Sequence, residues 1–252
     1  YLLLEPSRTN SLTQSEYFEN YQSIIGATIT TNTTETLSPE GLYNATKIEC
    51  TGSWTIREAI ASLVGVEATT SFWVKAVNSN ANNNFKVRSH NADSPTSFIA
   101  TDEWVRYDYT NTGAGSYFGI SDSGNTDADL YIYGFQAEQG AYPTSYIPTY
   151  SVSATRAADT SSKTNASGEI NSTEGVLYAE IAGVGDGGTK RYISLSDGGY
   201  SNDVRLYLDT DGYISALTKV GGSTQAFLST NAYAQNDFNK IAFKYKENDF
   251  AL

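Results

Sequence analysis

Short stretches of Val, Ile, Thr, Tyr and Phe recur through the chain, and clusters of Gly, Asn, Asp and Ser separate them. In many of these stretches polar and apolar residues alternate, as they do on a strand that turns one face to a core. Short strands at regular intervals with turn residues between them are typical of a β-sandwich or barrel. The sequence therefore predicts an all-β protein, and only residues 15–21 and 57–63 are candidate short helices.

The predicted strands fall into two sets, separated by a segment rich in Ser, Thr, Ala and Asn. Such a segment cannot bury enough apolar surface to form a core of its own. We expect a first domain over residues 1–150, a linker over 151–171 and a second domain over 172–252. Residues 248–252 look like the beginning of a strand, so we expect the second sandwich to be incomplete as given. The first set covers residues 24–31, 45–51, 55–61, 69–77, 84–90, 103–110, 117–121 and 129–138, and the second covers 175–182, 191–196, 203–208, 213–219, 225–229 and 239–245.

Composition excludes several classes of protein. With 16 Lys and Arg against 28 Asp and Glu, the chain has a formal charge of −12. Proteins bind the negatively charged backbone of a nucleic acid mainly through Lys and Arg, so no nucleic acid is expected as a partner. The single Cys excludes an intrachain disulfide and a zinc cluster. No apolar run is long enough to span a membrane, so no membrane insertion is predicted. A chain of 252 residues can bury a sizeable core without such supports.

Several segments resemble known proteins. Residues 2–10, LLLEPSRTN, resemble the entry segment of many phage tail-associated and secreted bacterial proteins, in which a carbohydrate-binding-module-like jelly roll follows. Residues 71–76, 101–107, 130–138 and 142–149 resemble strands and the exit of that jelly roll, and residues 155–159 resemble the usual sequel. Residues 174–180 and 244–250 resemble a concanavalin-A-like, laminin-G-like sandwich. The resemblance implies two β-sandwiches in tandem, the first a jelly roll and the second concanavalin-A-like.

The same resemblance implies a function. We expect a non-catalytic glycan-binding or adhesion segment of a phage virion surface protein, such as a tail fibre or decoration protein, located outside the cell on the virion. Its expected partners are a polysaccharide or cell-surface glycan, other virion proteins and copies of itself, as a trimer. Two alternatives stay open. The first is a structural virion protein whose sheet faces contact neighbouring subunits, since Tyr with Ser, Gly and Asn is an interface composition. The second is a set of binding modules of a secreted polysaccharide-degrading enzyme.

Strand parity suggests where a glycan would bind. In residues 84–90, Phe85 and Val87 share one face while Lys86, Arg88 and His90 share the other. Aromatic rings stack on the apolar faces of sugars, and Arg forks hold hydroxyls and carboxylates. The alternative is that these residues are only the polar outer face of antiparallel sheets. The predicted glycan-binding residues are Trp54, Arg57, Trp73, Arg88, His90 and Arg106.

One acidic loop is a candidate metal site. Asp122, Asp127 and Asp129 lie within eight residues of one another together with Asn125, and hard cations prefer such oxygen ligands. The favoured interpretation is a solvated acidic loop, and the alternative is a structural Ca²⁺, the only cofactor that the sequence suggests.

No motif in the sequence predicts catalysis. Residues 183–188 match G-x-G-x-x-G, but a strand-like segment follows where a dinucleotide site needs a helix. Cys50 lies in a strand-like segment and is explained as a small strand residue. No pair of carboxylates stands out among the 28 acidic residues, so we expect no enzyme.

Overall fold

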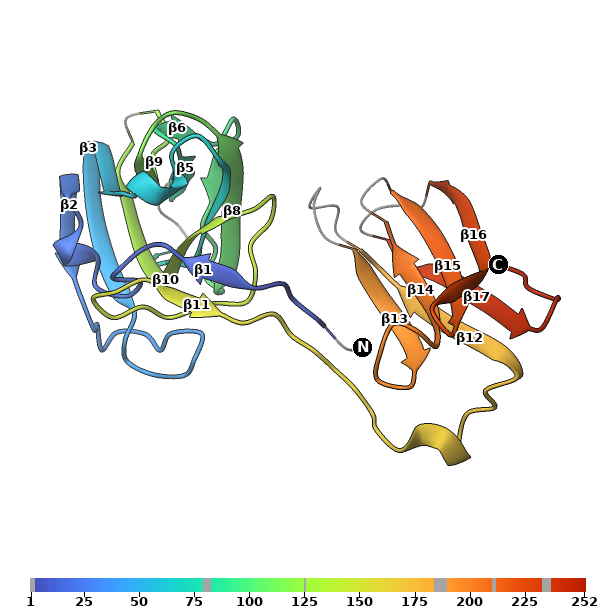
Figure 1. Ribbon diagram of the computed structural model, residues 1–252. Helices are drawn as coiled ribbons and strands as arrows, with labels where there is room; N and C mark the ends of the chain where they lie inside the picture. The colour runs from blue at the N-terminus through green and yellow to red at the C-terminus, as the bar shows by residue number, and fades with distance from the viewer. Residues whose placement is uncertain (1–2, 79–82, 125, 184–189, 210–211, 233–236) are drawn as a thin grey trace. The chain divides into compact units, whose positions relative to one another are not determined.

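The computed structural model describes residues 3–78, 83–124, 126–183, 190–209, 212–232 and 237–252. Apart from three short 3₁₀ turns, the regular secondary structure of these residues is all strand, which confirms the all-β prediction (Figure 1). The chain divides into a unit of residues Tyr1–Thr160 and a unit of residues Ser161–Leu252. This division lies inside the segment predicted as a linker.

In the first unit, nine strands form one continuous hydrogen-bonded sheet, and β1 pairs with β11 in a separate two-stranded sheet. The order in the nine-stranded sheet is β6-β5-β9-β3-β10-β4-β8, with β2 added beside β3 and β7 beside β5. The elements are β1 (Arg8–Asn10), η1 (Phe18–Asn20), β2 (Ser23–Thr30), β3 (Thr46–Ala59), η2 (Ala61–Leu63), β4 (Glu67–Ala76), β5 (Asn84–Ser89), β6 (Ala92–Asp93), β7 (Phe98–Ile99), β8 (Val105–Thr112), β9 (Tyr117–Asp122), β10 (Ala128–Gln139) and β11 (Ala154–Arg156).

Strand β3 joins the two layers of the sandwich. Its first half pairs with β10 and its second half, Thr55 to Ala59, pairs with β9. Gly52 lies between the halves with a φ of 60°, and β2 follows the same bend through a bulge at Gly26, whose φ is 62°. Positive φ is readily adopted by glycine, which has no Cβ. The sequence predicted two strands here, and the structure corrects them to one bent strand.

The core confirms the parity argument for two strands. Phe72 and Val74 of β4, like Phe85 and Val87 of β5, are fully buried. The Phe72 ring lies 4.6 Å from the Phe135 ring of β10 and 6.4 Å from the Phe85 ring, so side chains of both layers meet at Phe72. Burial of such rings is the main stabilising contribution of the core.

The predicted short helices are replaced by smaller features. Within residues 15–21 the structure has a single 3₁₀ turn, Phe18–Asn20, whose Phe18 is buried. Of residues 57–63, the first three continue β3 and the last three form the 3₁₀ turn Ala61–Leu63. Apolar spacing in so short a segment fits a strand and a helix equally, and pairing of Arg57 to Ala59 with β9 decides for the strand.

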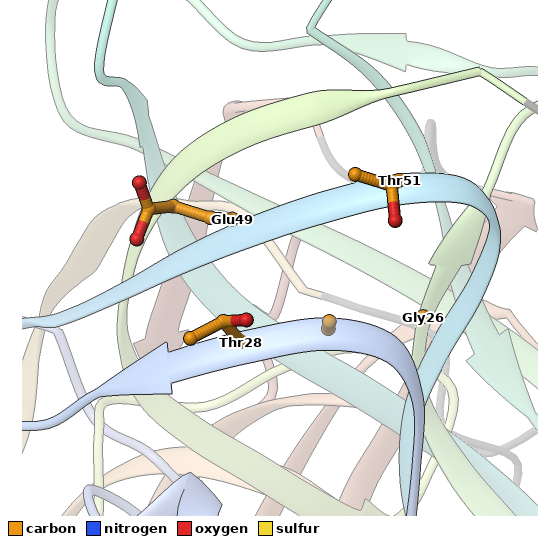
Figure 2. Close-up of a pocket in the computed structure, with 5 residues that line it drawn as sticks. Gly26, Thr28, Glu49 and Thr51 are labelled. Carbon is orange, nitrogen blue, oxygen red and sulfur yellow. The ribbon is translucent and has the colours of Figure 1, made fainter.

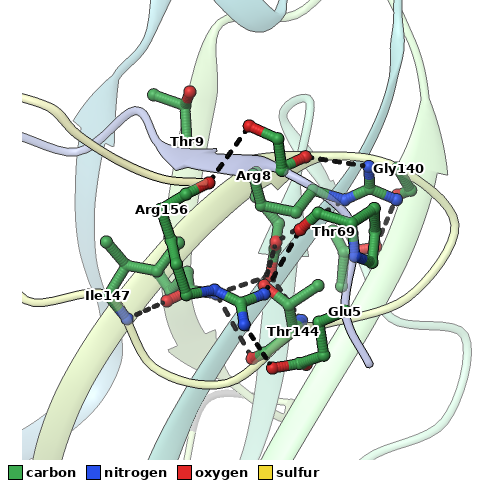
Figure 3. Close-up of polar contacts among 12 residues, drawn as sticks. Glu5, Arg8, Thr9, Thr69, Gly140, Thr144, Ile147 and Arg156 are labelled. Carbon is green, nitrogen blue, oxygen red and sulfur yellow. Dashed lines mark hydrogen bonds and ion pairs between the residues drawn. The ribbon is translucent and has the colours of Figure 1, made fainter. Parts of the chain in front are cut away.

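The N-terminal segment is fastened to the end of the first unit (Figure 3). β1 pairs with β11, with Arg8 opposite Arg156, so the first unit continues past the predicted boundary at residue 150. Arg156 Nη1 donates to Glu5 Oε2 at 2.6 Å. The fully buried Glu138 accepts hydrogen bonds from the Thr144 backbone N–H at 2.8 Å and the Thr144 hydroxyl at 2.7 Å. The charged residues of the LLLEPSRTN segment thus have a structural role.

The second unit is a smaller sandwich with its own core. A four-stranded sheet in the order β13-β14-β15-β16 packs against the pair β12-β17. Its core holds Leu206 and Ala216 of the larger sheet and Phe243 of the pair, all fully buried. Its likeness to concanavalin A stays a prediction. The elements are η3 (Ala166–Gly168), β12 (Glu174–Ile181), β13 (Arg191–Ser196), β14 (Asp203–Leu208), β15 (Tyr213–Val220), β16 (Ser223–Ala232) and β17 (Asn239–Lys246). Among the described residues of the chain, no helix has the length and apolar character needed to cross a membrane.

Candidate functional site

Trp54 does not lie at an exposed loop edge. Only 1% of its surface is exposed, and its indole Nε1 donates to the Thr126 carbonyl at 3.0 Å. Trp54 follows the alternation of β3, in which Ile48, Cys50 and Ile56 are also buried, so its side chain points into the core. A ring buried in this way cannot stack on a sugar, so the prediction of Trp54 as a glycan-binding residue is wrong.

His90 is also buried. Strand β5 ends at Ser89, and His90 begins the turn to β6 with a φ of 53°, which breaks the alternation that placed it beside Arg88. Its Nε2 lies 2.8 Å from the Leu63 carbonyl oxygen, and its ring packs edge-on against Phe118 with centroids 4.8 Å apart. His90 is therefore a core residue and is unable to contact a glycan.

Trp73 and Arg106 lie together, but they are used in packing. They are register partners on β4 and β8, and the Arg106 guanidinium lies 4.6 Å over the Trp73 ring. Arg106 donates to the Thr144 carbonyl at 2.7 Å and to the Ser71 hydroxyl at 2.9 Å. Tyr146 packs edge-on against the same indole ring at 5.7 Å. Burial lowers the pKa of Arg106, as expected for a cation sheltered from water.

Arg57 and Arg88 lie on the outward surface of the other layer. Arg57 of β3 pairs with Gly119 of β9, and Gly119 pairs on its other side with Arg88 of β5. The residues of opposite parity on these strands, such as Ile56 and Ile120, are fully buried, so the arginines point away from the core. We call this surface the β3–β9–β5 face. It consists of Thr55, Arg57, Tyr117, Gly119, Ser121, Lys86 and Arg88, with Asp93 of β6 at its edge.

Each arginine of this face is held in a defined way. The Arg57 guanidinium lies 4.2 Å over the Tyr117 ring, and its Nε donates to the Ser23 hydroxyl at 3.3 Å. Arg88 donates to both carboxylate oxygens of Asp93, at 2.7 and 3.0 Å. Burial opposes ionisation of Asp93, but the hydrogen bonds from Arg88 and Ser121 outweigh it and lower the pKa of this carboxyl. The face is thus ordered before any ligand arrives.

Sequence parity missed five members of this face, namely Thr55, Tyr117, Gly119, Ser121 and Asp93. The prediction identified outward faces by their Lys, Arg and His residues, and the segments that contain Tyr117, Gly119 and Asp93 have none. Tyr117 and Gly119 alternate with the buried Phe118 and Ile120, and this signal could have placed them outward. Strand β9 pairs with both β3 and β5, which are distant from it in sequence, and alternation within a strand does not predict such pairing.

A shallow groove continues along β2 and β3 (Figure 2). It has a volume of about 540 Å³ and is lined by Gly26, Ala27, Thr28, Glu49 and Thr51. Thr28 and Glu49 are register partners on the outward side of the two strands. The groove offers hydroxyl and carboxylate oxygens, which can bind sugar hydroxyls.

The predicted calcium ligands do not form a cluster. Among the described residues there is no group of three or more His, Cys, Asp or Glu side chains able to hold a metal ion. Asp127 accepts a hydrogen bond from the Gly52 backbone N–H at 2.7 Å, and Asp122 Oδ1 lies 3.5 Å from the Ser53 hydroxyl. Asp129 lies on β10 opposite Glu49. Asn125 and most of the glycine-rich segment at 183–188 lie outside the described residues.

The lone cysteine has no features of a nucleophile. Cys50 is buried, and burial together with the nearby charge of Asp129 raises the pKa of its thiol. A thiol in such surroundings stays protonated, whereas the thiolate is the reactive form. Cys50 therefore has a packing role.

Seven chains of solved structures are similar to this one, among them a xylan-binding domain and a phage baseplate protein, both with low TM-scores. No protein-family model matches the chain, and no curated protein matches it. The CBM22-1 xylan-binding domain of Xyn10C from Paenibacillus barcinonensis has a TM-score of 0.33 and 15% identity, and the match covers 54% of this chain and 94% of that one. The tripod (BppUct-A-L) from the baseplate of bacteriophage Tuc2009 has a TM-score of 0.30 and 12% identity, over 96% of this chain and 91% of that one. At such values neither structure transfers a ligand or a role to this protein.

Proposed function

We propose that this chain is a non-catalytic glycan-binding segment of a phage virion surface protein, and that the β3–β9–β5 face is its glycan-binding surface. The observation that carries the proposal is the row formed by Arg57, Gly119 and Arg88 across three adjacent strands. Ordered guanidinium groups on the outward side of a sheet offer several N–H donors to sugar oxygens without a large ordering cost. Weak individual contacts would be strengthened by repetition in a trimer on the virion.

The phage setting rests on the resemblance of residues 2–10 and of the sandwich strands that follow. In the structure the residues of this segment fasten the two ends of the first unit to each other, through Glu5, Arg156 and the pairing of β1 with β11. A closed, self-contained module of this kind suits a protein built from repeated binding units. Polysaccharides or cell-surface glycans are the partners proposed for it.

Retention of the full chain in affinity gels containing polysaccharides tests this proposal. Tyr117→Ala removes the ring beneath Arg57 and is expected to reduce retention, while Tyr43→Ala, at a residue 58% exposed elsewhere in the first unit, is the matched control. Both variants should keep the melting temperature of the first unit within a few degrees, since neither residue is in the core. Absence of retention on every polysaccharide offered would overturn the proposal.

A second candidate function is a structural contact within the virion. The second unit exposes large apolar side chains, including Tyr178 at 58%, Tyr200 at 64% and Phe227 at 57%. Tyr178 lies on β12, Phe227 on β16 and Tyr200 in the loop between β13 and β14, and exposed side chains of this kind suit contacts between subunits. The mass of the chain in solution tests this role, because a strict monomer at high concentration argues against both a trimer and a subunit contact through these side chains.

A further inference from the structure

The β3–β9–β5 face has a charge opposite to that of the whole protein. It carries the cations Arg57, Lys86 and Arg88 and the single carboxylate of Asp93, whereas the chain has a formal charge of −12. Among the described residues, only Arg88 of these three cations forms an ion pair with a carboxylate. Within the described part of the molecule, Arg57 and Lys86 thus form no ion pair with a carboxylate, although the charge of Lys86 helps to lower the pKa of Asp93.

Arg57 is positioned to bind an anionic group. Its stacking on Tyr117 and the bond from its Nε to Ser23 fix the plane of the guanidinium. The Nη donors are not used in these two contacts, and a planar fork of this kind matches a carboxylate. The stacked ring also orders the side chain in advance, which lowers the entropic cost of binding.

Lys86 adds a second positive charge near the same row. The next row of the face runs from Thr55 through Ser121 to Lys86, directly beside the row that holds Arg57 and Arg88. Arg57 and Arg88 are two strands apart, or roughly 10 Å between backbones. A chain molecule lying across the strands would meet a cation on either side of Gly119.

We propose that the ligand of the β3–β9–β5 face is an acidic glycan, one whose carboxylate groups are bound by Arg57 and Lys86. This inference rests on the proposed function and narrows it to a substrate class. Carboxylates of the sugar chain would replace the missing protein carboxylates on the face.

Affinity electrophoresis and calorimetry of the full chain test the substrate class. The probes are polygalacturonate and hyaluronan as acidic polysaccharides, and dextran and xylan as neutral ones, from about 0.02 to about 0.5 M NaCl. Binding to the acidic polysaccharides is expected to be stronger and to weaken as salt rises. Arg57→Gln and Lys86→Gln should each weaken that binding by roughly tenfold, about 1.4 kcal/mol.

Lys75→Gln is the matched control for these variants. Lys75 lies on β4 in the other layer, and the variant removes the same charge from the same unit while leaving the face intact. Its binding should stay within about twofold of the parent protein. Arg57→Gln also removes the stacking on Tyr117 and could lower the stability of the first unit. Lys86→Gln does not remove that contact, so it tests the role of charge independently.

The outcomes separate the two proposals. Equal, salt-independent binding of acidic and neutral polysaccharides, lost in Arg57→Gln, would overturn the acidic class but leave glycan binding at this face. Loss of binding only in Glu49→Gln would place the ligand in the groove of Thr28 and Glu49. That result would overturn both the acidic-glycan assignment and the assignment of the β3–β9–β5 face as the binding surface. Binding to duplex DNA equal to that of hyaluronan would also overturn the acidic-glycan assignment. No binding to any glycan would overturn the proposed function itself.

Discussion

Arg57 and Arg88 are register partners of the same residue, Gly119, on opposite sides of strand β9. Their relationship depends on a close approach of β3 and β9. A Cβ built on Gly119 would collide with the Ile56 carbonyl oxygen and lie 2.8 Å from the Arg57 Cα. Real Cβ atoms do not make such contacts, so the strands would have to separate to admit a side chain.

Gly119→Ala is therefore expected to destabilise the first unit by about 1–3 kcal/mol, the usual cost of overpacking. Thermal or denaturant unfolding monitored by tryptophan fluorescence measures the change. Gly168→Ala is the control, since a Cβ there meets nothing within 4 Å. Equal stability of the two variants would show that β3 and β9 are not in such close contact.

Trp54→Phe separates packing from ligand binding. The indole is buried and donates to the Thr126 carbonyl, so the variant should lose about 1–3 kcal/mol of stability through a smaller ring and an unpaired carbonyl. Polysaccharide retention by the folded protein should be unchanged. Retention lost at an unchanged melting temperature would restore Trp54 as a sugar-binding residue.

How far the sequence predicts this fold is clearest at individual strands. Alternation placed Phe72, Val74, Phe85 and Val87 inward correctly, because a strand with one buried face must repeat every two residues. It predicted two strands where β3 is one, since the residues around Gly52 resemble a turn. The chain bends there without leaving the sheet because β2 bends with it and keeps the pairing on both sides.

The site was less predictable than the fold. Parity identified Arg57 and Arg88 as outward residues but could not bring them together, because their neighbourhood depends on β9, which lies far from both in sequence. Parity also failed at His90, where a turn with positive φ redirects the side chain into the core. For Trp73 and Arg106, parity predicted the correct face of the sheet. It did not predict that the Arg106 guanidinium stacks on the Trp73 ring and donates a hydrogen bond to the Thr144 carbonyl.

Removal of divalent cations should leave the protein unchanged. Gly52 N–H and the Ser53 hydroxyl, both protein groups, lie within hydrogen-bonding distance of Asp127 and Asp122, and the described residues form no metal-binding cluster. Since a bound ion stabilises the folded state by mass action, the melting temperature in EDTA should equal that in millimolar CaCl₂. A rise of several degrees with CaCl₂ that Asp127→Asn abolishes would contradict this and would establish the calcium site.

The Asp93 carboxylate should make the first unit acid-sensitive. Its pKa is lowered in the folded protein, since the hydrogen bonds from Arg88 and Ser121 outweigh the opposing effect of burial. A carboxyl with a depressed folded pKa contributes stability above its unfolded pKa of about 3.9, and this contribution is lost as pH falls through the lower folded value. Asp93→Asn is therefore expected to be less stable than the parent protein at pH 7, and the difference should shrink below about pH 4.

Urea unfolding of both proteins from neutral pH down to acid measures this difference. Asp102→Asn, an exposed residue before β8, is the control and should follow the parent protein across the same range. Because Arg88 would keep its charge while losing its partner, Asp93→Asn also leaves a third unpaired cation on the β3–β9–β5 face. It should bind hyaluronan more strongly than the parent does at low salt, provided that both are folded. A stability difference that stays constant through the acid range would mean that the ion pair of Arg88 and Asp93 contributes nothing in solution.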